Sequence, residues 1–495
     1  MPAEQTPHDA VAYPSFSFPE THPGNLAAMA TLHGLSPAPV EQCRVLEIGC
    51  NEGGNLIPMA YGLPKSEFAG FDLARLPVER GQQRIRALGL NNVRIFDADL
   101  LDVGKELGQF DYIVAHGVYA WVPQNVSARL IALCGELLTP SGVAFISYDA
   151  KPGGYLRTML REMMLFGAEG LSEPGDRVAA GREFLQFVLG ERPEGDLSRP
   201  LIEKQLARME KRSAESIFHD ELTDSYHPVY FTEFVEQARK HGLQYLSEAV
   251  LPPPTDPSYR SALWPMLETA AGGDIVKQEQ ILDFVRLRNY RETLLCRAEH
   301  EPRRDFPIDA MRRLLLASPA TSGPGETPGA REFTLPSGIK TETNHPAVIR
   351  LLEALEAAWP RRLSFPEIEP LLATPGSRLD QEAAVLLMRL AVSGMIEFHA
   401  WSPAFAESIS LRPRASANSV QEAWTHPWAV TLLHSTIGLH DPVVRSFLKL
   451  LDGTHAREDL LKAVGSEYPS MSAEEVEAGM KSTLGYFYRA GLLEA

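Results

Sequence analysis

The sequence predicts an α/β protein: a Rossmann-like, seven-stranded sheet with a helical insertion, followed by winged-helix-like α+β domains. Three observations support this prediction. Short apolar strands alternate with helices between residues 44 and 147. A stretch rich in Pro, Gly, Ser and Thr covers residues 317–344. Two helical stretches of similar outline follow, and each ends on a short strand.

The alternating part begins after a Pro-rich N-terminus that contains one helical patch at residues 25–35. We expect strands at residues 44–48, 67–71, 93–96, 112–115 and 143–147, and helices at residues 54–61, 74–88 and 127–138. Gly89 suits the end of the second helix, and Pro140 stops the third. Strands joined in this way run parallel, with helices on both faces of the sheet.

The chain turns helical from residue 155 to about residue 224, with Met- and Leu-rich faces. A helix at 231–241, a strand at 243–250, a helical stretch at 255–289 and a strand at 291–297 follow, so two late strands complete the sheet. We therefore divide the chain into an N-terminal lid or extension (1–42), a core (43–305) with a helical insertion at about 155–290, a linker (306–344) and two winged-helix-like domains (345–415 and 416–495).

The composition narrows the class of partner. The chain has 495 residues and a formal net charge of −17, and an acidic surface repels the phosphates of nucleic acid. No apolar run is long enough to predict a membrane span, and the polar N-terminus does not read as a secretory signal. The four cysteines are scattered without metal-ligand spacing, so we expect no metal and a reduced, cytoplasmic location. The pattern does not distinguish a monomer from a homodimer.

An acidic glycine-rich loop, Glu47-x-Gly49-x-x-x-Gly53, follows the first strand. Dinucleotide-binding folds carry GxGxxG at this turn, facing a pyrophosphate. S-adenosyl-L-methionine (SAM) has no phosphate but carries a sulfonium and an ammonium, so a carboxylate at Glu47 suits SAM better. Asn51 replaces the middle glycine of the common ExGxGxG form, and asparagine tolerates left-handed backbone angles.

Three further features follow in the order typical of class I SAM-dependent methyltransferases. Asp72 ends the second strand, where a carboxylate binds the ribose hydroxyls. Asp99 follows the third strand, where it can accept a proton from the adenine amino group, and Phe110-Asp111 opens the fourth. NAD sites also place an acidic residue after the second strand, so the prediction of SAM rests on all four features together: the acidic loop, Asp72, Asp99 and Phe110-Asp111. The predicted cofactor-binding residues are Glu47, Gly49, Cys50, Asn51, Gly53, Asn55, Asp72, Leu73, Asp99, Leu100 and His116.

A long aromatic segment, Ala115-His-Gly-Val-Tyr-Ala-Trp-Val-Pro123, follows the fourth strand. With Thr21-His-Pro23, Tyr148-Asp-Ala-Lys-Pro-Gly-Gly154, His227-Pro-Val-Tyr-Phe231, Arg288-Asn-Tyr-Arg-Glu-Thr-Leu-Leu295 and Leu451-Asp-Gly-Thr-His455, it resembles bacterial methyltransferases that carry a methyltransferase regulatory domain. The characterised members that it resembles are rickettsial-type protein-lysine methyltransferases that modify an outer-membrane protein. The resemblance covers nearly the whole chain and implies a SAM-binding catalytic domain, a helical middle region and C-terminal modules that help to hold a protein substrate.

Four residues are the predicted catalytic set: Tyr119, His116, Trp121 and Tyr148. Tyr119 and Trp121 lie just past the fourth strand, where aromatic faces could hold a cationic or methylated amine. His116 and Tyr148 could bond the amine or relay its proton. Packing in the core is the competing interpretation for each aromatic ring.

Three functions remain open at this stage. The first is methylation of lysine side chains on a protein, with the C-terminal modules holding the substrate. The second is methylation of a small molecule by the same core. The third is a regulatory protein that binds SAM without turnover. The large appendages favour a large substrate, because a small one would need only a lid.

Overall fold

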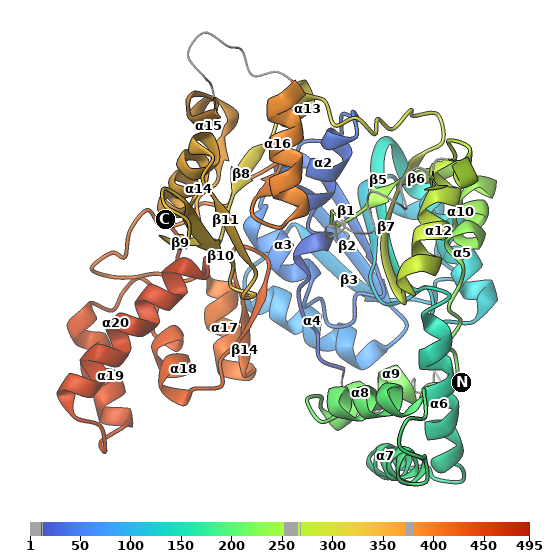
Figure 1. Cartoon of the computed structure of the whole chain (residues 1–495). Helices are drawn as coiled ribbons and strands as arrows, with labels where there is room; N and C mark the ends of the chain where they lie inside the picture. The colour runs from blue at the N-terminus through green and yellow to red at the C-terminus, as the bar shows by residue number, and fades with distance from the viewer. Residues whose placement is uncertain (1–10, 12, 252–265, 268, 373–380) are drawn as a thin grey trace.

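The centre of the protein is a seven-stranded sheet with the order β3-β2-β1-β4-β5-β7-β6. The computed structural model describes residues 11, 13–251, 266–267, 269–372 and 381–495 (Figure 1). The strands are β1 (Arg44–Ile48), β2 (Glu67–Asp72), β3 (Val93–Asp97), β4 (Phe110–Ala115), β5 (Leu138–Asp149), β6 (Leu243–Glu248) and β7 (Tyr290–Arg297). The first five run parallel, and β7 is antiparallel to β5 and β6. The predicted seven-stranded, Rossmann-like sheet is confirmed.

Helices cover both faces of this sheet, because its strands are apolar on both sides. Successive residues of β1 show the alternation: Val45 packs with α2 and α3, whereas Leu46 packs with α5 and α10 on the other face. The helices are α2 (Pro23–Leu32), α3 (Leu56–Gly62), α4 (Arg75–Ala87), α5 (Gln124–Leu137), α10 (Phe231–Lys240) and α12 (Ile275–Arg286). The carboxyl ends of the parallel strands meet at one edge, where α/β sheets bind their ligands.

The helical insertion forms a bundle with a core of its own, drawn below the sheet in Figure 1. Its helices are α6 (Gly154–Gly167), α7 (Pro174–Gly190), α8 (Arg199–Met209) and α9 (Ala214–Glu221). Met164 and Met209 are buried in that core, so the Met-rich face is a packing surface. Part of the helical stretch predicted over 255–289 appears as α12, while residues 252–265 and 268 lie outside the described part of the chain.

The segment expected as an N-terminal lid contributes to the core instead. After the short turn η1 (Pro19–Thr21), α2 is buried along almost its whole length, and Leu26, Ala28 and Leu32 have no exposed surface. A helix that is apolar on every side must be buried, and α2 packs between the sheet and the C-terminal region. The lid interpretation is therefore wrong for residues 23–32.

The segment expected as a linker is also structured. Within residues 306–344 the chain forms α13 (Ile308–Met311), β8 (Leu315–Ala317), β9 (Thr321–Pro324), β10 (Arg331–Thr334) and β11 (Lys340–Thr343). The last three pair as an antiparallel sheet, with Phe333 fully buried beneath it. The Pro and Gly residues therefore lie in and around a small sheet, and the prediction of a linker over residues 306–344 is wrong where these elements form.

Two C-terminal modules complete the chain (Figure 1). The first contains α14 (Pro346–Ala358), β12 (Leu363–Ser364), α15 (Phe365–Leu372), α16 (Gln381–Val392) and β13 (Glu397–His399). The second contains α17 (Ala417–Thr425), β14 (Trp428–Val430), β15 (Thr436–Gly438), α18 (Pro442–Lys449), α19 (Arg457–Glu467) and α20 (Ala473–Arg489). The first shares a core with the large sheet, and the second has a core of its own. Their winged-helix character stays a prediction.

Within the described residues, we find no helix with both the length and the apolar character needed to cross a bilayer.

Candidate functional site

The loop between β1 and α3 turns sharply at the carboxyl end of the sheet. Gly49, Asn51 and Gly53 have φ angles of 74°, 49° and 76°, all in the left-handed region. A Cβ on Gly49 would come within 2.5 Å of the Val118 side chain, so only glycine fits that position. Asn51 adopts a left-handed angle that asparagine tolerates, at the position where the common ExGxGxG form has glycine.

Glu47 presents an unsatisfied oxygen beside this loop. The side chain is 5% exposed, and its Oε1 accepts a hydrogen bond of 2.8 Å from Asn55 Nδ2. The other oxygen, Oε2, is buried and has no hydrogen-bond partner among the described residues. Burial, with the charge of Asp72 nearby, raises the pKa of Glu47 to about 8. A cationic donor would satisfy Oε2, and the ammonium of SAM is such a donor.

Asp72 and Asp99 lie along the same edge of the sheet. Asp72 accepts hydrogen bonds from the backbone N–H groups of Asn51, at 2.8 Å, and Ala74, at 2.9 Å. Asp99 accepts one of 2.9 Å from Leu101 N–H. These bonds hold both carboxylates at the ends of neighbouring strands, as a ribose and an adenine lying across the edge would require.

The remaining predicted cofactor residues divide by exposure. Leu73 is 60% exposed beside Asp72, whereas Cys50, Asn55 and Leu100 are buried. Leu73 is thus available to cover a ligand, whereas the other three side chains are packed inside the protein.

His116 follows β4 and lies against the N-terminal segment. Its ring stacks on Phe18 at 3.8 Å between centroids, and its Nε2 is 3.3 Å from the hydroxyl of Tyr290. Burial lowers the pKa of His116 to about 4, so the ring is neutral at pH 7. A neutral imidazole can accept a proton.

Two carboxyl groups that the sequence analysis missed surround this imidazole. Potential ligand atoms of Glu20, His116 and Glu292 lie within 4.8 Å of one another, and the two glutamates are hydrogen bonded to each other. Burial and mutual repulsion raise the pKa of Glu292 to about 8, and burial raises that of Glu20. The two carboxyls therefore share a proton, because burial and mutual repulsion oppose the ionisation of both. In the sequence, Glu292 stands out only as a member of the motif at residues 288–295, and Glu20 only as the residue that precedes the motif Thr21-His-Pro23.

We name Glu20, His116, Glu292 and Tyr290 the acceptor cluster. Among the described residues, its first three members are the one group whose spacing could also hold a metal ion. Its chemistry, two carboxyls beside a neutral imidazole, equally suits a cationic amine.

Tyr119 and Tyr148 point into the core. They are 7% and 1% exposed, and both pack on Phe234, at 5.3 Å and 4.3 Å between ring centroids. The hydroxyl of Tyr148 lies 3.2 Å from Thr293 Oγ1. The structure therefore places these rings in the packing position that the competing interpretation expects.

Trp121 is covered by arginines. The guanidinium carbons of Arg157 and Arg161 lie 4.7 Å and 5.2 Å from the Trp121 ring, and Tyr226 lies 4.9 Å away. Cation–π attraction to these two guanidiniums already uses the ring, so a substrate amine would have to displace them.

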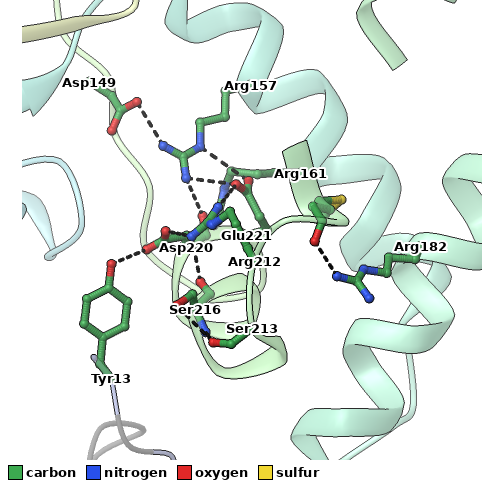
Figure 2. A network of polar contacts seen from close by, with 11 residues as sticks. Tyr13, Asp149, Arg157, Arg161, Arg182, Arg212, Ser213, Ser216, Asp220 and Glu221 are labelled. Carbon is green, nitrogen blue, oxygen red and sulfur yellow. Dashed lines mark hydrogen bonds and ion pairs between the residues drawn. The ribbon is translucent and has the colours of Figure 1, made fainter. Parts of the chain in front are cut away.

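These arginines belong to a network that joins the insertion to the sheet (Figure 2). Arg157 bonds Asp149 at the end of β5, at 3.3 Å, and Glu221 at the end of α9, at 3.0 Å. Arg212 pairs with Asp220 and, at 3.4 Å, with Glu221. The network fixes the bundle against the aromatic segment after β4, so Trp121 of that segment has a packing role at this junction.

Comparison with known proteins identifies the class that the sheet and the acidic loop define. A methyltransferase domain matches residues 46–144, and a predicted methyltransferase regulatory domain matches residues 213–297. The protein is a SAM-dependent methyltransferase, and SAM is its cofactor. The chain belongs to the methyltransferases that carry a methyltransferase regulatory domain. The matched regulatory region includes β6 and β7, so it supplies two strands of the large sheet as well as helices.

Two curated relatives are proteins of Rickettsia prowazekii. The uncharacterized protein RP028 of Rickettsia prowazekii is 34% identical over 240 residues, which cover 48% of this chain and 96% of the relative. The uncharacterized protein RP789 of the same organism is 33% identical over 314 residues, covering 63% of this chain and 56% of RP789. The chain thus spans little more than half of RP789. The structure of PKMT2 from Rickettsia typhi in complex with AdoHcy is 25% identical, with a TM-score of 0.85, and covers 97% of this chain and 99% of PKMT2.

The raised pKa of Glu47 predicts that SAM binding depends on pH. The unliganded folded protein favours the neutral carboxyl of Glu47. Its stability therefore falls as the pH rises from the pKa of the unfolded state, near 4.5, to the pKa of the folded state, about 8. SAM, in contrast, requires the carboxylate. We expect its affinity to rise close to tenfold between pH 6 and 7, with release of about one proton, since Glu47 must ionise on binding.

Isothermal titration calorimetry at pH 6.5, in two buffers with different ionisation enthalpies, measures this release. Glu47→Gln is the matched control, because a glutamine has no proton to release. A binding heat that does not depend on the buffer, together with a flat affinity profile, would contradict the prediction.

Proposed function

We propose that this protein transfers methyl groups from SAM to lysine side chains of a protein substrate. One observation carries the proposal: the acceptor cluster joins two carboxyls and a neutral imidazole at the end of β4, the strand that pairs with β1 and so lies beside the strand leading into the SAM loop. Such a group recognises a cation that must lose a proton before it reacts. A lysine ammonium, with an ordinary pKa near 10.4, is that kind of group.

The roles of the residues follow from their protonation. The negative charge shared by Glu20 and Glu292 attracts the lysine ammonium, and His116 or the ionised carboxyl accepts its proton. SAM supplies an electrophilic methyl group, and the sulfonium sulfur from which it departs becomes a neutral thioether. Tyr290, within 3.3 Å of His116 Nε2, holds the imidazole in place.

A protein substrate is favoured over a small molecule for two reasons. Two C-terminal modules accompany the methyltransferase domain, far more structure than a small substrate needs. The chain also resembles PKMT2, a protein lysine methyltransferase, along 97% of its length. The net charge of −17 favours a substrate that is not nucleic acid. Four buried, free cysteines are consistent with a cytoplasmic location.

The test is a transfer assay with methyl-labelled SAM and a lysate of the protein's own host. We expect label in a discrete protein band, on lysine by mass spectrometry, and no label with Asp72→Ala. Label confined to small molecules would replace the proposal with methylation of a metabolite. Absence of label would indicate a regulatory protein that binds SAM without turnover.

Replacing Glu292 with glutamine tests the acceptor cluster itself. We expect kcat to fall about tenfold, because one proton acceptor is lost while Glu20 and His116 remain. The affinity for SAM, measured by calorimetry, should stay within about twofold of the parent value, since Glu292 acts on the acceptor amine. Glu67→Gln, which changes an exposed carboxylate paired with Arg44, is the control. A loss of SAM affinity equal to the loss of kcat would contradict the assignment.

A further inference from the structure

The turn between β14 and β15 carries His434 from the second C-terminal module into the methyltransferase domain. His434 is 4% exposed and has a left-handed φ of 61°, within a turn closed by hydrogen bonds between Thr431 and both His434 and Ser435. Its Nε2 lies 2.8 Å from Asn55 Oδ1, although the two residues are 379 positions apart in the sequence. A residue of the C-terminal module therefore contacts the helix start that follows the SAM loop.

This contact fixes the orientation of the Asn55 amide. Burial lowers the pKa of His434 to about 3, so the ring is neutral, and because the amide oxygen Oδ1 can only accept, the Nε2 that faces it carries the proton. Asn55 Oδ1 also accepts from the backbone N–H of Phe18, at 3.0 Å. Two N–H donors, from Phe18 and His434, therefore face Oδ1. If the Asn55 amide were rotated by 180°, its NH₂ group would face these donors, so Nδ2 must point the other way.

The amide nitrogen held in this way orients Glu47. Asn55 Nδ2 donates to Glu47 Oε1 at 2.8 Å, which leaves Oε2 as the buried oxygen without a partner. The same hydrogen bond lowers the pKa of Glu47 against the effect of burial and so favours the carboxylate form that a cation needs.

We propose that the C-terminal module completes the cofactor site: His434 is a positioning residue that holds Asn55, and through Asn55 the carboxylate of Glu47, for the ammonium of SAM. The affinity for a ligand with this ammonium then depends on the packing of a module that lies outside the methyltransferase fold. The inference rests on SAM binding and is independent of the substrate that receives the methyl group.

The test compares ligands with and without the amino-acid part. SAM and AdoHcy carry the ammonium, whereas 5′-methylthioadenosine has the adenosine and the thioether alone. His434→Leu is expected to weaken SAM and AdoHcy about tenfold in calorimetry and to leave 5′-methylthioadenosine within about twofold. His434→Gln keeps an N–H donor at a similar reach and should restore most of the affinity.

Tyr61→Phe is the matched control. It removes two contacts of the same module, from the Tyr61 hydroxyl to Glu494, at 2.8 Å, and to the N–H of Ala417, at 3.1 Å, but leaves Asn55 untouched. Its SAM affinity should equal that of the parent protein. Thermal unfolding without ligand shows whether each variant folds.

Two results would overturn the proposal. One is an unchanged SAM affinity in a folded His434→Leu protein. The other is an equal loss of SAM and 5′-methylthioadenosine binding, which would show that the change loosens the whole site rather than the ammonium position.

Discussion

Replacing Arg291 with methionine is expected to lower the free energy of unfolding by about 3–5 kcal/mol. The Arg291 side chain has no exposed surface and bonds Asp283, Glu248 and Glu279 at 2.8, 2.6 and 3.0 Å. Its guanidinium carbon also lies 3.8 Å from the centroid of the Phe231 ring. Methionine fills much of the space but removes the nearer cation, so the three carboxylates keep only the longer ion pairs to Arg288, at 3.4 to 3.8 Å. Removing one partner from buried ion pairs is strongly destabilising.

The loss should depend on pH. Burial already raises the pKa of Asp283, and Arg291 opposes that rise. Without the arginine the folded-state pKa rises further, so the variant keeps more stability at pH 5 and loses it as the pH rises towards 8. Urea unfolding at both pH values measures the difference. Arg75→Met is the control, since its partner Glu79 is a half-exposed surface residue and the pair contributes little. A change below about 1 kcal/mol at pH 8 would mean that the network does not stabilise the fold.

This network also concerns the site, because Arg291 lies between Tyr290 and Glu292 on β7. The ion pairs to α12 and β6 hold the strand that carries half of the acceptor cluster. A destabilised Arg291→Met protein should therefore lose activity as well as stability, whereas Glu292→Gln should lose activity alone.

Glu47→Gln should weaken SAM binding about 100-fold while the protein remains folded. Glutamine has the shape of the glutamate and keeps an oxygen for Asn55 Nδ2. It would place an NH₂ group where Oε2 now lies, and that group repels an ammonium. Removing one partner of a buried charge pair costs about 2–5 kcal/mol, and the free energy that corresponds to a 100-fold loss of affinity lies within this range.

The measurement is calorimetry with SAM and with 5′-methylthioadenosine. The second ligand should bind the variant as it binds the parent, because it has no ammonium. The unliganded variant should not be less stable than the parent at pH 8, since a neutral amide avoids the burial of a charge. SAM affinity that survives the substitution would refute the assignment of Glu47 to the ammonium.

The sequence by itself determined the sheet and its cofactor edge. Residues 44–147 alternate between strands and helices, and this order predicts a parallel sheet covered by helices. The carboxyl ends of parallel strands meet at one edge, so Glu47, Asp72 and Asp99 come together there. A left-handed angle at Asn51 could be anticipated because the loop geometry is local. These features depend on residues that are near neighbours in the chain.

Only the tertiary structure decided which side chains meet across long separations. The four residues predicted to be catalytic carried suitable chemistry, but Tyr119 and Tyr148 face the core and arginines cover Trp121, because strand alternation and long-range packing set the direction of a side chain. Glu20 and Glu292 join His116 from opposite ends of the methyltransferase region, and His434 reaches Asn55 from the C-terminal module. No local pattern records such contacts, since their free energy comes from the burial of whole elements rather than from the spacing of residues along the chain.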